Sequence, residues 1–164
     1  CLLWSLCEAT PPKRILDMGS GFSSFVFRRY RSTAQLKPEV WSVDESPEWL
    51  EKTRTYLRSR GLSDDNLMSW ADFQASDSGR FDLISLDLGH MSRRPDIFEE
   101  LLELRNPEGL IILDDLHNSE YRTEIVLRLN SQAAVAGYSV RWLTLDKFLR
   151  YCLLVRPRPE PQKS

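Results

Sequence analysis

Five apolar, strand-like runs in this chain end in aspartate, and helix-like segments separate most of them. The runs are 13–17, 40–44, 67–72, 81–87 and 109–115, and their closing acids are Asp17, Asp44, Asp72, Asp87 and the pair Asp114 and Asp115. Strands that alternate with helices are typical of an α/β sandwich with a mostly parallel sheet. The carboxyl ends of such strands line one ligand crevice. We therefore expect an acidic pocket that suits a cationic group, a sugar diol or a metal rather than a phosphate.

Periodicity and turn residues predict the order of the elements. Helices are expected over 2–9, about 23–31, 47–60, 95–105 and 119–134, and strands over 14–18, 40–44, 67–72, 81–87 and 110–113. Ser23 or Ser24 would cap the second helix, and Ser46 with Pro47 would open the third. The last two runs, 140–143 and 148–155, predict an antiparallel hairpin that closes the sheet.

The length of 164 residues suits one domain, which we place at 1–155, followed by a flexible tail at 156–164 with three prolines and mixed charge. The chain begins with Cys1 rather than Met, so further residues are expected upstream. A net charge of −2 gives no general attraction to nucleic acid.

The expected compartment is the cytoplasm. No apolar stretch approaches the roughly 20 residues that span a bilayer, and the first residues lack the basic leader of a signal peptide. We therefore expect no membrane partner. The three cysteines, Cys1, Cys7 and Cys152, form neither an even disulfide set nor a CxxC metal spacing, which favours a reducing environment.

A glycine-rich loop follows the first strand, with Asp17 two residues before Gly19-Ser20-Gly21. Such a loop lets the backbone approach a ligand closely, and the carboxylate would repel a pyrophosphate and attract an ammonium group. Asp44 ends the second strand, where it can accept hydrogen bonds from both hydroxyls of a ribose. Asp72 could meet an adenine amine beside the ring of Phe73. The alternatives are that Asp17 and Asp72 only cap turns or helices.

The order of Asp17-x-Gly19-x-Gly21, Asp44 and Asp72-Phe73 resembles the class I S-adenosylmethionine-dependent methyltransferases over about residues 13–155. The resemblance implies a Rossmann-like three-layer fold with seven strands, the last antiparallel, and S-adenosylmethionine as cofactor. It places the methionine moiety near Asp17 and Gly19, the ribose on Asp44 and the adenine on Asp72. Ser23 departs from the family, in which many members have a further glycine. The expected cofactor-binding residues are Asp17, Gly19, Ser20, Gly21, Ser23, Asp44, Glu45, Asp72, Phe73 and Asp87.

A second acidic group comes from Asp87-Leu88-Gly89-His90 and from Asp114-Asp115-Leu116-His117. Uncompensated carboxylates at neighbouring strand ends would repel one another, so we expect a divalent cation such as Mg²⁺ between Asp87, Asp114 and Asp115. The arrangement resembles the metal-dependent O-methyltransferases of the catechol and caffeoyl-CoA type and their sugar-modifying relatives. The resemblance implies that Asp87 takes part in catalysis and that His90 replaces the lysine base of that family. Alternatively, His90 and Asp115 cap the helices that follow them.

The expected activity is methyl transfer from S-adenosylmethionine to a hydroxyl oxygen of a small molecule, assisted by a divalent cation. Loops at 89–94 and 116–121 would select the substrate. The alternatives are a metal-independent methyltransferase acting on nitrogen or on a macromolecule, a nicotinamide dehydrogenase, and a noncatalytic cofactor-binding domain. The usual N-terminal helices that cover the substrate are short here, and the second copy in a homodimer could supply that cover.

Overall fold

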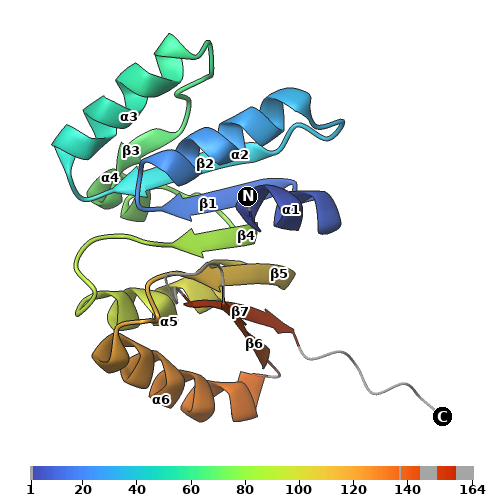
Figure 1. Ribbon diagram of the computed structural model, residues 1–164, viewed down its shortest axis with the longest axis vertical. Helices are drawn as coiled ribbons and strands as arrows, with labels where there is room; N and C mark the ends of the chain where they lie inside the picture. The colour runs from blue at the N-terminus through green and yellow to red at the C-terminus, as the bar shows by residue number, and fades with distance from the viewer. Residues whose placement is uncertain (1, 137, 145–150, 158–164) are drawn as a thin grey trace.

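The computed structural model describes residues 2–136, 138–144 and 151–157, within which seven strands form one sheet (Figure 1). The strand order is β3-β2-β1-β4-β5-β7-β6. Strand β7 is antiparallel to both neighbours, and the other pairs are parallel. The predicted α/β class with an antiparallel last strand is therefore confirmed. In chain order the elements are α1 (Leu2–Ala9), β1 (Arg14–Met18), α2 (Phe22–Thr33), β2 (Glu39–Asp44), α3 (Pro47–Ser59), β3 (Leu67–Ser69), α4 (Trp70–Gln74), β4 (Phe81–Leu86), α5 (Arg94–Leu104), β5 (Arg105–Leu113), α6 (Ser119–Ala136), β6 (Tyr138–Thr144) and β7 (Tyr151–Pro157).

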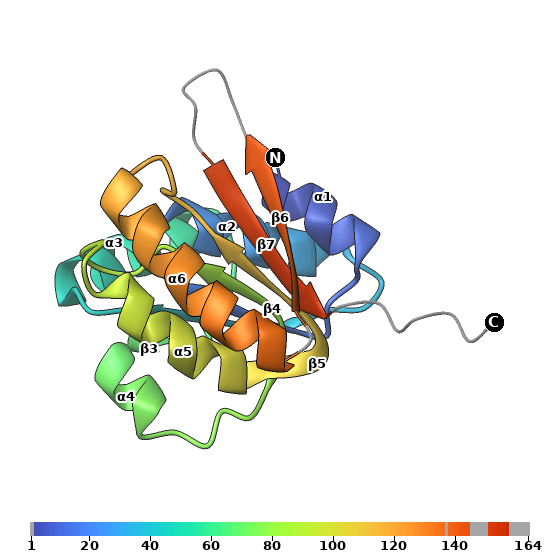
Figure 2. The ribbon, with the colours of Figure 1, turned by 90° about the horizontal axis from the view of Figure 1, so that it is seen from below.

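Helices cover both faces of the sheet, with α1, α2 and α3 on one face and α4, α5 and α6 on the other (Figure 2). Successive residues of β1 alternate between the two layers, because strand side chains point to opposite faces. Ile15 packs with Phe27 of α2, whereas Leu16 belongs to the core that contains Phe98 of α5 and Ile125 of α6. This double coverage explains why the central strands are continuous apolar runs. Within the described residues, no helix has the length and apolar character needed to cross a bilayer.

The third strand is shorter than the sequence predicts. Strand β3 ends at Ser69, and the expected strand residues up to Asp72 form the short helix α4 instead. The hydroxyl of Ser69 caps this helix by accepting from the amide of Asp72 at 3.1 Å. Trp70 and Phe73, which share one helical face, are buried and stack at 5.6 Å. The prediction of a strand end at Asp72 is wrong because this cap and this aromatic pair favour a helical turn.

Strand β5 starts earlier than expected, at Arg105 rather than Leu110. Arg105 pairs with Phe81 and Leu110 with Leu83, and the register shifts between these two pairs. The Arg105 guanidinium holds the intervening segment by donating to the carbonyl oxygens of Asn106, Pro107 and Gly109, at 2.8, 2.6 and 3.0 Å. A bulge of this kind has no simple periodicity, so the sequence suggested a loop there.

Other boundaries also differ from the predictions. Helix α2 has Gly21 as its N-cap rather than Ser23 or Ser24, and Ser24 Oγ accepts from the Gly21 amide at 3.2 Å. Strand β7 extends to Pro157, so regular structure continues past the predicted start of the tail at 156. Residues 158–164 of that tail, and residues 148–150 of the predicted last strand, lie outside the described residues.

Asp17 lies inside the layer between β1 and α2 and is 1% exposed. Its Oδ2 accepts from Ser24 Oγ at 2.5 Å and from Ser42 Oγ at 2.9 Å. Arg28 donates to the same Ser42 hydroxyl at 2.6 Å and to the Asp65 carbonyl at 2.9 Å. Burial raises the pKa of Asp17, and the hydroxyl groups and Arg28 oppose that shift. Asp17 therefore joins α2 to the first two strands.

We predict that Ser42→Ala lowers the free energy of unfolding by about 1–3 kcal/mol, because Asp17 and Arg28 each lose a buried partner. Urea denaturation measures the change. Ser59→Ala, at the exposed end of α3, is the matched control and should be close to neutral. Equal stabilities of the two variants would contradict a structural role for the buried network.

Candidate functional site

A groove of about 620 Å³ lies where the carboxyl ends of β1, β2 and β4 meet. Three of its lining residues are acidic, and none of those assigned to it in the described chain is Lys or Arg. This composition agrees with the expected acidic pocket. The lining residues are Gly19, Ser20, Gly21, Phe22, Asp44, Glu45, Ser46, Trp49, Asp87 and Gly89.

Gly19 brings the loop after β1 against the loop after β4. Its φ is +110°, and a Cβ at this position would lie 2.7 Å from the carbonyl oxygen of Asp87. The Gly19 amide donates to Val43 O at 2.8 Å, and the Asp87 amide donates to Met18 O at 2.7 Å. A side chain here would be both strained and in collision with backbone atoms. In the structure, Gly19 closely approaches the backbone at the end of β4, and the predicted approach of this loop to a ligand stays a prediction.

Asp44 lines the groove at the end of β2 and is 9% exposed. Its Oδ2 accepts from the amide and hydroxyl of Ser20, at 2.7 and 2.8 Å, and its Oδ1 accepts from the amide of Ser46 at 2.9 Å. A carboxylate offers about four lone-pair sites. The three hydrogen bonds orient Asp44 and leave it capacity for a further donor from the groove.

The remaining predicted cofactor residues fall into two sets. Ser20, Gly21, Glu45 and Asp87 line the groove, and Glu45 also pairs with Arg93 at 2.7 Å. Four other residues have partners elsewhere and are not among the lining residues: Asp17, Ser23, Asp72 and Phe73. Asp72 accepts from Ser69 Oγ at 2.6 Å on α4, and Phe73 lines a separate cavity with Trp70. Their contacts with a cofactor stay predictions.

Two aromatic side chains of the groove were not assigned to it from the sequence. Phe22 is 69% exposed and Trp49 is 54% exposed, and both line the groove. Trp49 is an exception to the usual burial of large aromatic side chains. The sequence signal that could have placed Phe22 at the groove is its position directly after the glycine loop, where the first turn of α2 begins.

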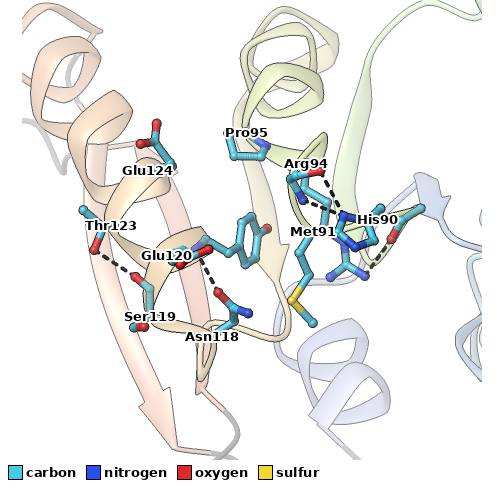
Figure 3. Close-up of a pocket in the computed structure, with 12 residues that line it drawn as sticks. His90, Met91, Arg94, Pro95, Asn118, Ser119, Glu120, Thr123 and Glu124 are labelled. Carbon is cyan, nitrogen blue, oxygen red and sulfur yellow. Dashed lines mark hydrogen bonds between the residues drawn. The ribbon is translucent and has the colours of Figure 1, made fainter.

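A second cavity, of about 900 Å³, adjoins the groove and shares Gly89 with it. Figure 3 shows His90, Met91 and Arg94 on one side and Asn118, Ser119 and Glu120 from the start of α6 on the other. The two segments predicted to select the substrate, 89–94 and 116–121, therefore both contribute to this cavity.

His90 lines the second cavity and is exposed. Its Nδ1 lies 2.9 Å from Ser92 Oγ and accepts from the Ser92 amide at 3.3 Å. When Nδ1 accepts, the neutral ring carries its proton on Nε2; when Nδ1–H donates to Ser92 Oγ, Nε2 becomes the acceptor. The bond from the Ser92 amide therefore favours the Nε2–H tautomer of His90.

Arg94 lies between the carboxylates of the second acidic group, and its side chain is 5% exposed. It pairs with Asp87 Oδ1 at 2.8 Å and with Asp115 Oδ2 at 3.2 Å. Asp87 and Asp115 therefore share one positive charge, so the premise that these carboxylates are uncompensated is wrong for those two. In the described part of the chain, no group of three His, Cys, Asp or Glu side chains is arranged to hold a metal ion. These residues do not fit the expected divalent cation.

The loop after β5 is fixed by local hydrogen bonds. Asp115 has a φ of +61°, and its amide donates to Asp114 Oδ1 at 2.8 Å. The following helix is capped by Asn118, whose Oδ1 accepts from the Tyr121 amide at 3.0 Å. The alternative in which Asp115 caps that helix is thus wrong, because Asn118 occupies the capping position.

The pKa of Asp87 is raised to about 6. Partial desolvation of this carboxyl, whose side chain is still 55% exposed, is the main cause; the Asp115 and Asp114 carboxylates add to the shift, and Arg94 opposes it. Asp87 consequently holds a proton more tightly in the folded chain than an ordinary aspartate does.

Comparison with known proteins shows the family to which this chain belongs. The methyltransferase domain family matches residues 10–145. A curated relative, the O-methyltransferase hkm8 of Aspergillus hancockii, is 29% identical over 122 residues. That match covers 69% of this chain and 46% of the relative, so the chain spans under half of the relative's length.

Solved structures with the same fold include three methyltransferases. The O-methyltransferase of Bacillus cereus, in complex with SAH, has a TM-score of 0.73 at 18% identity and covers 94% of this chain and 79% of its own. TomG of Streptomyces achromogenes, in complex with SAM, has a TM-score of 0.75 at 16% identity, with coverages of 96% and 78%. PaMTH1 of Podospora anserina, bound to SAH, has a TM-score of 0.72 at 18% identity, with coverages of 96% and 76%. At these identities, the likeness establishes the fold.

We predict that Gly19→Ala lowers the free energy of unfolding by at least about 2 kcal/mol, because it combines a strained φ with a backbone collision. Gly21→Ala separates the two effects: Gly21 has a φ of +151°, but no atom lies within 4 Å of a Cβ there. Thermal and urea denaturation should show the larger loss at Gly19. A loss at Gly21 as large as that at Gly19 would show that the contact with Asp87 is unimportant.

We also predict a pH-dependent effect of Asp87→Asn. Because the pKa of Asp87 is about 6 in the folded chain and 3.8 ordinarily, the folded state binds more protons between these values, and this group makes stability fall as the pH rises from about 4 to 6. The variant should lose less stability than the wild type over this interval in urea titrations. Asp77→Asn, in an exposed turn, should follow the wild-type profile. If the Asp87→Asn profile also followed that of the wild type, the raised pKa of Asp87 would be refuted.

Proposed function

This chain belongs to the methyltransferase domain family, and we propose that it transfers a methyl group from S-adenosylmethionine to a hydroxyl oxygen of a small molecule. The curated relative is an O-methyltransferase, and two structures of the same fold were solved with SAH and one with SAM. The observation that carries the proposal is Asp44, held by three hydrogen bonds in an acidic groove beside the glycine loop.

The groove has the donor set that this cofactor would need. S-adenosylmethionine, when bound, supplies an electrophilic methyl group on sulfur and carries an ammonium, a ribose and an adenine but no phosphate. Asp44 has acceptor capacity left for a ribose hydroxyl. The acidic lining favours positive charge, and the exposed rings of Phe22 and Trp49 can pack against a base.

The second cavity supports a small acceptor. Its volume of about 900 Å³ is in the range of small-molecule sites, and it meets the cofactor groove at Gly89. His90 lines it, so an acceptor hydroxyl placed there would have a base beside it. In this structure the Ser92 amide donates to Nδ1 of His90. Nε2 can take the hydroxyl proton in the other tautomer, in which Nδ1–H donates to Ser92 Oγ instead. We propose that Asp87 helps to position the loop at which the two cavities meet.

The divalent cation expected from the sequence is not part of this proposal. Arg94 already pairs with Asp87 and Asp115, so the chain itself supplies a positive charge to these two carboxylates. The work of the protein is then to hold donor and acceptor in line and to remove the acceptor proton.

We predict that Asp44→Asn weakens the binding of S-adenosylmethionine about tenfold or more, because an amide cannot accept at both of its terminal atoms and hydrogen bonds to a charged acceptor are strong. Isothermal titration calorimetry of the cofactor and of S-adenosylhomocysteine measures the loss. Asp77→Asn is the control and should bind like the wild type. Absence of binding in the wild type would overturn the proposal in favour of a noncatalytic domain.

We predict that His90→Gln lowers kcat by about 10²-fold and leaves cofactor affinity unchanged, because only proton removal is lost. The assay is transfer of labelled methyl from S-adenosylmethionine to a panel of phenols, catechols and glycosides. An unchanged kcat would remove His90 as the base. Methylation of amines or RNA in place of these hydroxyl compounds would overturn the choice of acceptor.

A further inference from the structure

Arg94 is the most completely bonded charged side chain around the two cavities. Besides its ion pairs with Asp87 and Asp115, its Nε donates to Leu88 O at 3.1 Å and its Nη2 to Asp87 O and Gly89 O, both at 3.3 Å. The guanidinium carbon also lies 5.8 Å from the centre of the Tyr121 ring. One cation therefore satisfies two carboxylates and three consecutive backbone carbonyls.

These contacts make Arg94 difficult to displace. A buried guanidinium that left this position would strand its own charge or expose five acceptors that now share its protons. It starts α5, where Pro95 follows it, so its backbone is fixed by the helix. Arg94 is therefore part of the architecture of the 87–89 loop, not a surface side chain that happens to lie nearby.

The same contacts are incompatible with a divalent cation at these residues. One oxygen of each carboxylate, Asp87 Oδ1 and Asp115 Oδ2, already accepts from Arg94. A metal ion at the remaining lone pairs would lie beside a buried positive charge, and like charges repel strongly at such separations. Of these three carboxylates, Asp114 alone forms no ion pair with Arg94 in the described part of the chain, and its Oδ1 accepts from the Asp115 amide.

We propose that Arg94, and not a divalent metal ion, is the resident cation of this site, where it positions the 87–89 loop at the junction of the two cavities. This assignment also affects which acceptors are methylated, and that consequence rests on the proposed function. A metal ion at these carboxylates could hold an acceptor through two adjacent oxygens, whereas a site without the metal sets no such requirement. Acceptors with a single hydroxyl should therefore be methylated as well as matched vicinal diols or catechols.

The direct test is binding of Mn²⁺ to the whole chain, followed by electron paramagnetic resonance, with no cofactor or acceptor present. The wild type should show no Mn²⁺ site with a Kd below about 1 mM. That limit is as weak as the weakest protein sites for Ca²⁺. Arg94→Met frees Asp87 and Asp115 and should gain Mn²⁺ affinity by tenfold or more. Adding Asp114→Asn to that variant should abolish the gain.

Arg54→Met is the matched control, because Arg54 also bridges two carboxylates, Glu51 and Asp64, but on the surface of α3. It should gain no Mn²⁺ site. Tight Mn²⁺ binding by the wild type that Asp114→Asn removes would overturn the proposal, and this result needs no Arg94 variant to fold. If Arg94→Met does not fold, the wild-type titration decides the question.

A second measurement separates this proposal from the proposed function. Methyl transfer by the wild type should be unchanged by EDTA, with kcat/KM for monohydroxy acceptors within about threefold of matched catechols. Activity that EDTA abolishes and Mg²⁺ restores would overturn the role of Arg94. If no acceptor is methylated, the proposed function fails, whereas the Mn²⁺ titration still decides which cation the site holds.

Discussion

The parallel pairing of β1 with both β2 and β4 is the constraint on which the rest of the structure depends. It brings three strand ends to one edge of the sheet, where Gly19 is bonded to Val43 and packed against the backbone of Asp87. The cofactor groove lies between these strand ends, and the loop that follows Asp87 forms the boundary with the second cavity. A shift of β1 by one residue would turn Asp17 out of its buried network and move the glycine loop away from β4.

Each carboxylate around this edge is stabilised in a different way. Asp17 is bonded to hydroxyl groups beside Arg28, Asp44 accepts from two backbone amides and a hydroxyl, and Asp87 shares Arg94 with Asp115. Because a buried charge is costly without partners, these arrangements are what allow so many acids to be close together. They also separate the roles, since Asp44 faces a groove with acceptor capacity to spare and Asp17 does not. The acidic sequence pattern therefore combines structural and ligand-facing residues.

Much of the fold could be predicted because its signals are local. The Ser46-Pro47 cap and the apolar runs of β1, β2 and β4 all act within a few residues, and the structure confirms them. The failures at two element boundaries have local causes that apolar periodicity does not show. The run after β3 becomes a helix through the stacking of Trp70 on Phe73, and β5 starts at Arg105 because its side chain holds a bulge. The partner of Asp87 could not be inferred, because the sequence placed Arg94 only at the end of a loop expected to select the substrate.

The sequence by itself determined the α/β alternation, the family resemblance and the acids and glycines that gather at one edge of the sheet. These follow from periodicity and from the rule that parallel strands end together. Only the tertiary structure decided which acid faces the groove, that Phe22 and Trp49 flank it, and that an arginine lies between Asp87 and Asp115. The physical reason is that burial and charge pairing depend on contacts between side chains from separate elements. Local sequence patterns do not specify those contacts.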